Sequence, residues 1–294
     1  MKVVAVHDYP STAHERRIVT AAGGVFVDAN GLPLEKALRE CEDADAILVR
    51  WLAVGPELMR RFRRCKIILR YGVGTDNVDA NAATAAGIMV GHSPSYCLDE
   101  VATHALALLL ACARNVASNH VRLARGDWQN NPPAKLYRMA GRTLGLVGLG
   151  NIGRAVARKL AGWDMRLLAT DPFVEPERAA ALGVRLVDLD TLCRESDYLS
   201  LHVPLLPETR HIIGKPQLDL VKTGVMLVNT ARGPVLDADA LLDALNKGTV
   251  AAAGLDVFEQ EPLAADSPLR RHPRVVLSDH TAWYSEESQA ELRS

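Results

Sequence analysis

The feature that most constrains the fold is the glycine-rich segment Gly148-Leu149-Gly150-Asn151-Ile152-Gly153. The apolar run 143–147 precedes it and a helix-like stretch, 155–160, follows it. A strand, a glycine-rich turn and a helix in this order are typical of a dinucleotide-binding unit, with the pyrophosphate at the helix N-terminus. The first glycine allows a tight turn, the second lets the backbone approach the pyrophosphate, and the third lets helix and strand pack closely.

The choice of dinucleotide depends on Asp171, which follows the next apolar run, 165–169, about 18 residues beyond Gly153. Its carboxylate can accept hydrogen bonds from both hydroxyls of the adenosine ribose and would repel a 2′-phosphate, so we expect NAD rather than NADP. The alternative is a plain structural turn beside a surface aspartate. The full pattern favours the cofactor, and the expected contacts are Gly148, Gly150, Asn151, Ile152, Gly153 and Asp171.

Short runs of Val, Ile and Leu alternate with helix-like segments along nearly all of the 294 residues. This pattern is typical of parallel sheets covered on both faces, and it occurs twice. We therefore expect an α/β protein with two doubly wound parallel-sheet domains, a flavodoxin-like substrate domain and a Rossmann-type cofactor domain. The first set of expected strands is 3–7, 25–27, 47–50, 67–70 and 88–90. The second set is 143–147, 165–169, 184–187, 198–202, 225–229, 251–256 and 275–278.

The domain bounds follow from these two sets. Residues 1–98 are expected to form the substrate domain, with 284–294 as a candidate return to it, and residues 99–283 the NAD-binding domain. A long helix from Asp99 to about Arg125, followed by a proline-containing loop, would connect them. Its apolar stretch, Ala105 to Ala113, is too short to span a bilayer and is typical of a buried helix.

Composition excludes several classes of function. Hydrophobic residues make up 48% and charged residues 23%, with a net charge of −1, which gives no field for nucleic acid or a membrane surface. The one dense basic cluster, Arg60 to Lys66, is interpreted as a solvated helix end. Five scattered cysteines form no C-x-x-C pair, so neither a disulfide framework nor a metal site is predicted. With no signal-peptide pattern, a cytoplasmic location is expected.

Three titratable side chains follow expected strands of the second set, where a parallel sheet forms its ligand crevice. Arg232 could grip a substrate carboxylate, His280 could deliver a proton to a carbonyl oxygen, and Glu261 could orient the imidazole. Taken singly, they could also be a turn residue, a satisfied loop histidine and a surface acid. Together they provide what the reduction of a 2-oxo acid needs.

With these segments in this order, the chain resembles the D-isomer-specific 2-hydroxyacid dehydrogenases. The resemblance rests on the late glycine fingerprint and on segments 229–233, 256–262 and 280, and it extends to Arg70-Tyr71-Gly72-Val73-Gly74. It implies a catalytic set of Arg232, Glu261 and His280, the last also adjoining the cofactor. It further implies that Tyr71, Gly72, Val73 and Gly74 bind the substrate carboxylate region, and that Val203, Pro204, Thr209, Thr230, Ala231 and Asp256 contact NAD.

Within that family, segment 280–285 is most similar to the C-terminal-binding-protein branch, whose animal members are NAD-binding corepressors. Trp283 is then either a wall of the substrate pocket, which we favour, or a packing residue. Arg50 could meet a second acidic group of the substrate or form a surface salt bridge. His104 could lie near the domain hinge or be an ordinary buried helix histidine.

The resemblance implies a homodimer built through the cofactor domain, to which the apolar helix Val101 to Ala113 could contribute. Family members continue with a helix that returns to the substrate domain, whereas this sequence stops at Ser294. The expected function is NAD-dependent interconversion of a small 2-hydroxy acid, of D configuration, and its 2-oxo acid. The alternative is an NAD-sensing binding protein with weak dehydrogenase activity.

Overall fold

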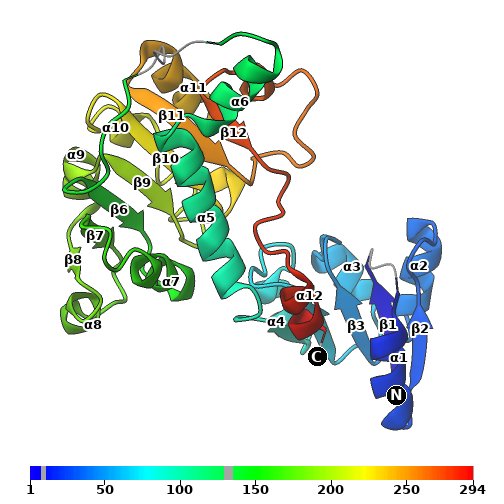
Figure 1. Ribbon diagram of the computed structural model, residues 1–294. Helices are drawn as coiled ribbons and strands as arrows, with labels where there is room; N and C mark the ends of the chain where they lie inside the picture. The colour runs from blue at the N-terminus through cyan, green and yellow to red at the C-terminus, as the bar shows by residue number, and fades with distance from the viewer. Residues whose placement is uncertain (8–10, 129–134, 294) are drawn as a thin grey trace. The chain divides into compact units, whose positions relative to one another are not determined.

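The computed structural model describes residues 1–7, 11–128 and 135–293 (Figure 1). The chain forms two compact units, of which the first comprises Met1–Tyr96 with Ser285–Ser294 and the second Cys97–Tyr284. The proline-containing loop expected after Trp128 lies outside the described residues.

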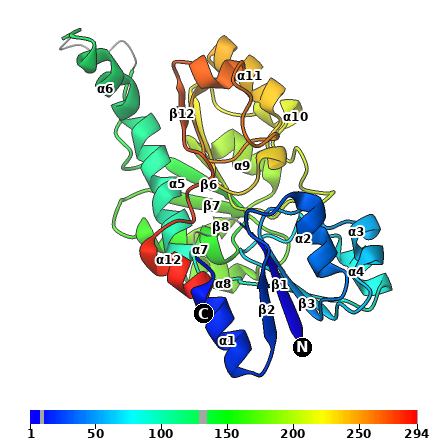
Figure 2. The same cartoon turned by 90° about the vertical axis from the view of Figure 1, so that its right-hand side faces the viewer.

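The first unit is built on a five-stranded parallel sheet with strand order β2-β1-β3-β4-β5, the flavodoxin-like order. Figure 2 shows its strands β2, β1 and β3 side by side. Both faces carry apolar side chains because successive residues of a strand point to opposite faces. Val4 belongs to one cluster of buried residues and Val3 and Ala5 to another. The strands are β1 (Lys2–Val6), β2 (Val25–Asp28), β3 (Ala46–Val49), β4 (Ile67–Arg70) and β5 (Met89–His92).

Helices complete the first unit, and a segment from the other end of the chain joins them. The helices are α1 (Ala13–Ala21), α2 (Leu34–Cys41), α3 (Pro56–Arg61), α4 (Ala80–Ala85) and α12 (Glu286–Leu292). Arg293, just after α12, forms an ion pair with the buried Glu15 of α1 at 2.8 Å. Residues 285–293 therefore return to the first unit, and α12 is their helix.

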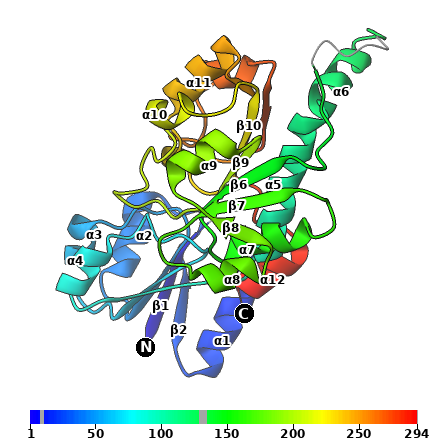
Figure 3. The ribbon, with the colours of Figure 1, turned by 90° about the vertical axis from the view of Figure 1, so that its left-hand side faces the viewer.

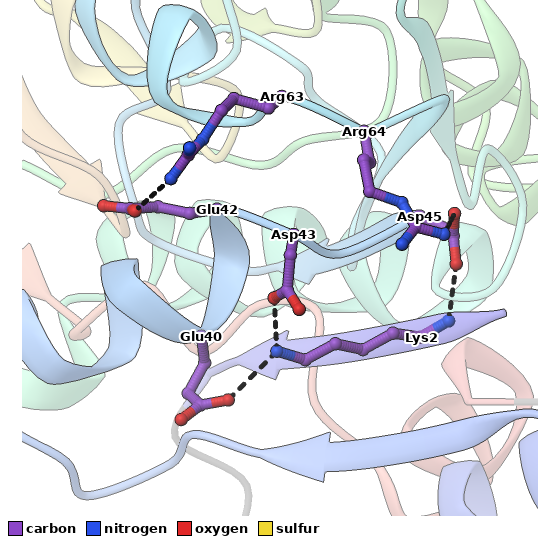
Figure 4. Close-up of polar contacts among 7 residues, drawn as sticks. All are labelled: Lys2, Glu40, Glu42, Asp43, Asp45, Arg63 and Arg64. Carbon is purple, nitrogen blue, oxygen red and sulfur yellow. Dashed lines mark hydrogen bonds and ion pairs between the residues drawn. The ribbon is translucent and has the colours of Figure 1, made fainter.

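The basic cluster after α3 is paired with carboxylates at the surface. Arg63 contacts Glu42 at 3.0 Å and Arg64 contacts Asp45 at 3.2 Å, and both guanidinium groups remain largely exposed (Figure 4). The backbone N–H of Lys2 donates to Asp45 at 2.7 Å, which joins the start of β1 to the same charged network. Exposed pairs of this kind add little stability. The interpretation of this cluster as a solvated helix end is confirmed.

The second unit contains a seven-stranded parallel sheet with order β12-β11-β10-β9-β6-β7-β8 (Figure 1). Figure 3 shows its strands β10, β9, β6, β7 and β8 from another side. The order reverses between β6 and β9, which is the topological switch point where such sheets bind ligands. Two doubly wound sheets confirm the expected fold class. The strands are β6 (Thr143–Val147), β7 (Arg166–Thr170), β8 (Val184–Leu186), β9 (Tyr198–Leu201), β10 (Val225–Asn229), β11 (Val250–Leu255) and β12 (Val275–Leu277).

The helical layers of the second unit pack closely on its sheet. At Gly254 of β11 an added Cβ would lie 2.8 Å from the Cβ of Leu108, so the glycine allows α5 to approach the strand. The α-helices are α5 (Leu98–Ala113), α6 (Val116–Ala124), α7 (Asn151–Lys159), α8 (Pro176–Ala180), α9 (Leu189–Glu195), α10 (Lys215–Leu218) and α11 (Ala238–Lys247). The 3₁₀ helices are η1 (Gly233–Val235) and η2 (Pro268–Arg271).

The expectation of one continuous helix from Asp99 to Arg125 is wrong. The helix is interrupted at Asn115, whose φ of 53° is left-handed, and α5 and α6 differ in direction by 62°. Asparagine tolerates this conformation better than most residues. The hydrophobic pattern of the sequence gave no sign of a break at this position. Among the described residues, no single helix is both long and apolar enough to cross a membrane; α5 and α6 together meet the criteria of length and composition.

Candidate active site

The three glycines of the fingerprint occupy three different environments between β6 and α7. Gly148 has a φ of 95°, and an added Cβ would lie 2.9 Å from the carbonyl carbon of His202. At Gly153 a Cβ would collide with the carbonyl oxygen of Gly148, whereas at Gly150 it would meet no described atom within 4 Å. Gly148 and Gly153 therefore serve the fold, and Gly150 leaves open space beside the N-terminus of α7.

Asp171 follows β7 and is tied to the glycine loop. Its Oδ2 accepts a hydrogen bond from the Leu149 N–H at 2.8 Å, and its Oδ1 accepts one from the Phe173 N–H at 2.9 Å. A carboxylate has about four lone-pair sites, so two hydroxyl donors could still be accepted. Asn151 and Ile152 lie in the first turn of α7, where Asn151 accepts a hydrogen bond from Arg154 at 2.6 Å.

The segment after β9 forms a turn closed by Thr209. The Thr209 hydroxyl donates to the Pro204 carbonyl at 2.6 Å and accepts from the Leu206 N–H at 2.8 Å. His202, between β9 and Val203, is hydrogen-bonded to the buried Ser200 at 2.8 Å, and burial lowers its pKa to about 4. This histidine is therefore neutral at physiological pH.

Arg232 stands on a turn that Asn229 organises. The Asn229 side chain, fully buried at the end of β10, donates to the Arg232 carbonyl at 2.8 Å and accepts from the Ala231 N–H at 3.0 Å. The Arg232 guanidinium donates to the Ala231 carbonyl at 2.7 Å. Thr230 Oγ1 is buried and has no hydrogen-bond partner among the described residues, as expected of a group that a cofactor satisfies.

Glu261 and His280 form a close pair. His280 Nδ1 lies 2.7 Å from Glu261 Oε2, and Glu261 Oε1 accepts from the Phe258 N–H at 2.9 Å. Burial would raise the pKa of Glu261, but the hydrogen bond and charge of His280, with a contribution from Arg232, hold this pKa below its usual value. The carboxylate stays ionised beside Nδ1 of the imidazole, and Nε2 is the ring nitrogen on the other side of the ring from this contact.

Asp256, at the end of β11, holds the loop that carries His280. It is 1% exposed; its Oδ1 accepts from the Thr281 N–H and its Oδ2 from the Ala282 N–H, both at 3.0 Å. The His280 N–H in turn donates to the Asp256 carbonyl at 2.8 Å. His280 has a left-handed φ of 57°, so these bonds stabilise a backbone conformation that histidine seldom adopts.

In the first unit, two arginines at the ends of neighbouring strands face one indole ring. The Arg50 guanidinium lies 4.8 Å from the centre of the Trp51 ring and that of Arg70 lies 5.9 Å from it. An added Cβ at Gly72 would collide with the Arg70 guanidinium, so this glycine makes room for the charge. The Arg70 guanidinium thus lies beside Gly72, and Arg50 contacts the same Trp51 ring as Arg70.

The side chains around this loop are held within the first unit. The Tyr71 hydroxyl donates to Glu15 at 3.1 Å, and the Val73 carbonyl accepts from His92 Nδ1 at 2.8 Å. Trp283 belongs to the second unit, where its ring meets that of Tyr284 edge to face at 5.4 Å. This contact is compatible with Trp283 as a wall of the substrate pocket and with Trp283 as a packing residue.

Four residues at the candidate sites were given no role of their own by the sequence patterns. Arg70 could have been found, because it ends a strand just as Arg50 does. Phe173 is 90% exposed near Asp171, and an apolar residue two positions after the acidic one is a detectable signal. Asn229 and Gly233 act through backbone contacts that no spacing rule reveals; a Cβ at Gly233 would collide with the Phe258 carbonyl group.

Comparisons with known proteins agree on one family. The model of the D-isomer specific 2-hydroxyacid dehydrogenase NAD-binding domain matches residues 106–282. A D-3-phosphoglycerate dehydrogenase of Methanocaldococcus jannaschii is 40% identical over 93% of this chain and 52% of its own length. A glyoxylate reductase of Korarchaeum cryptofilum is 42% identical over 88% of this chain and 80% of its own length.

Solved structures agree with this result. The D-lactate dehydrogenase of Aquifex aeolicus, in complex with NAD and lactic acid, is 29% identical with a TM-score of 0.88, over 99% of this chain and 92% of its own. This chain spans about half the length of the D-3-phosphoglycerate dehydrogenases it matches. The two sequence relatives are not C-terminal-binding proteins, so the expected family is confirmed and the expected branch is not.

Proposed function

Because the chain belongs to the D-isomer specific 2-hydroxyacid dehydrogenase family, we propose that it is an NAD-dependent oxidoreductase. It interconverts a small 2-hydroxy acid, of D configuration, and its 2-oxo acid. The observation that carries the proposal is the 2.7 Å pair of His280 and Glu261, with Arg232 close enough to lower the pKa of the carboxyl group. These are the groups that carbonyl reduction needs at one place.

In the proposed reaction the nicotinamide supplies or accepts the hydride, and the chain provides proton transfer and binding. His280 donates a proton from Nε2 to the carbonyl oxygen during reduction, and Glu261 holds the ring through Nδ1 and stabilises its charged form. Arg232 binds the substrate carboxylate and polarises the carbonyl. Oxidation uses the same groups in reverse, with His280 as the base.

NAD is the proposed cofactor, held by the second unit. The open space at Gly150, the N-terminus of α7 and the buried Thr230 hydroxyl suit a dinucleotide. The Asp171 carboxylate retains acceptor capacity for the two ribose hydroxyls and would repel the 2′-phosphate of NADP. Binding of NADPH as tight as that of NADH would contradict this choice.

A substrate with two acidic groups fits the first unit best. Backbone N–H groups of residues 72–74 would bind one carboxylate, and Arg50 and Arg70 would bind a second anion such as a phosphate or another carboxylate. The relatives named for 3-phosphoglycerate and for glyoxylate represent the two alternatives, a substrate with two acidic groups and a substrate with one.

The test is NADH oxidation, followed by absorbance, with singly charged, doubly charged and apolar 2-oxo acids, each repeated with NADPH. Fast NADH-specific turnover of one compound supports the enzyme. Arg232→Ala should lower kcat/KM about 100-fold or more with little change in NADH affinity, and His280→Asn should do so with cofactor binding intact. Tight NADH binding with negligible turnover of every acid would favour the NAD-sensing binding protein.

A homodimer is the proposed assembly. The apolar side chains of Val101 to Ala113 are mostly buried inside the second unit, so they are a poor dimer surface. In α6, by contrast, none of the residues is buried, and Val116, Val121 and Leu123 are each about half exposed. A second copy of the chain is the partner that would cover α6.

A further inference from the structure

Asp256 is the centre of a polar network that reaches from the His280 loop to helix α5. The Ser278 hydroxyl donates to Asp256 Oδ1 at 2.6 Å, and the same hydroxyl oxygen lies 2.8 Å from His104 Nε2. His104 Nε2 is also 3.6 Å from Asp256 Oδ1. All three residues belong to the second unit.

The direction of these hydrogen bonds can be deduced. A hydroxyl group has one hydrogen, and Ser278 gives it to Asp256 because a carboxylate can only accept. The Ser278 oxygen must therefore accept from His104, which means that His104 Nε2 carries a proton. His104 thus donates to the hydroxyl group that in turn donates to a carboxylate that is 1% exposed.

We propose that His104 is a positioning residue for His280, acting through Ser278 and Asp256. Asp256 holds the loop by accepting from Thr281 and Ala282, and its own orientation depends on the hydroxyl of Ser278, which His104 orients. His280 has a left-handed backbone and contacts Glu261 through a single ring nitrogen, so small loop shifts change the direction of Nε2. This inference rests on the proposed function.

The first test compares His104→Leu with Thr103→Ala, a change of the exposed neighbour on the same helix. His104→Leu should lower kcat about 10- to 100-fold, because misplacement of a reacting group has effects of this size. The dissociation constant for NADH should change less than about twofold, and Thr103→Ala should change neither quantity. A kcat within twofold of the wild type would overturn the proposal.

Two further variants separate positioning from packing. His104→Gln keeps an N–H donor and should recover most of the lost kcat, whereas a variant as slow as His104→Leu would show that only ring packing matters. Ser278→Ala removes the link with little change in volume. If His104 acts through Ser278, the double variant should be no slower than Ser278→Ala alone; independent, multiplying effects would contradict the route.

A spectroscopic measurement decides the question without catalysis. The imidazole Cε1–H resonance of His280 can be assigned by its absence in His280→Asn. It should move in His104→Leu and Ser278→Ala and keep its position in Thr103→Ala. An unchanged resonance overturns the positioning role, whereas absence of turnover in the wild type counts against the proposed function alone.

Discussion

At the scale of single residues, the candidate site depends as much on its glycines as on its charged groups. Gly233 follows Arg232, and its Cα faces the backbone of Phe258 in the segment that leads to Glu261. Any side chain there would separate the turn of Arg232 from the segment of Glu261. Arg232 and Glu261 lie on these two segments, and Arg232 contributes to the lowered pKa of Glu261 after the larger effects of His280.

Gly233→Ala should therefore impair both folding and activity. A Cβ would collide with backbone atoms that cannot rotate away, so we expect about 1–3 kcal/mol of lost stability together with a loss of kcat. Denaturant unfolding and the NADH assay measure the two effects. Gly55→Ala, where a Cβ meets no described atom within 4 Å and φ is −94°, is the control and should leave both unchanged. Normal stability of Gly233→Ala would refute the close contact.

His202 should make the protein sensitive to acid. Its pKa falls from 6.5 to about 4 on folding, so between these pH values the unfolded chain binds a proton that the folded protein does not. The free energy of unfolding should therefore decrease as pH falls from 6.5 to 4, by up to about 3 kcal/mol from this residue. In His202→Gln, which can still bond to Ser200, the decrease should be smaller. Equal slopes in the two proteins would argue against a neutral His202.

Sequence patterns predicted which residues carry charge at the strand ends but not how the loops between them are held. Arg232, Glu261 and His280 are conspicuous because few other residue types perform their chemistry. Asn229 organises its own turn through the Ala231 N–H and the Arg232 carbonyl. Asp256 instead accepts from the N–H groups of Thr281 and Ala282, which only the folded sheet brings next to it. Residue type therefore indicated the chemistry, and the sheet provided the geometry.

At the scale of elements, the strand-turn-helix unit of β6 and α7 separates binding from stability. Gly150→Ala should fold normally, since its Cβ meets no described atom within 4 Å, yet it should weaken NADH binding by occupying the space proposed for the pyrophosphate. Gly153→Ala should instead destabilise the unit, because its Cβ collides with the Gly148 carbonyl. Thermal unfolding and NADH titration of both variants distinguish the two effects. A Gly150→Ala protein with unchanged affinity would count against this cofactor site.

Strands were easier to predict than helix ends for a physical reason. A buried parallel strand is a continuous apolar run, as in 225–229, and both sheets were predicted from such runs. The break between α5 and α6 depends on one left-handed residue, Asn115, in a stretch whose hydrophobic pattern continues through it. Local backbone conformation of this kind has only a weak signal in a single sequence.

At the scale of the whole molecule, each unit has buried clusters of its own and its own parallel sheet. The order of the strands places the glycine loop, Asn229 and Asp256 at the carboxyl edge of one sheet. It places Arg50 and Arg70 at the carboxyl edge of the other. The topology of each sheet therefore brings together residues that are far apart in sequence. For this reason the alternation of strands and helices predicted which residues share a sheet edge, but not which side chains contact one another.

The proposed homodimer can be tested through substitutions in helix α6. Val121 and Leu123 are 48% and 51% exposed, and water contact of such side chains is unfavourable unless a partner covers them. The wild type should have about twice the mass of the 31.9 kDa chain in light scattering coupled to gel filtration. Val121→Glu with Leu123→Glu should yield the single chain, because two carboxylates would be buried without partners in the interface.

Met89→Glu, at an exposed residue of β5, should remain dimeric. A monomeric wild type, or a dimer that survives both changes in α6, would remove this helix as the interface.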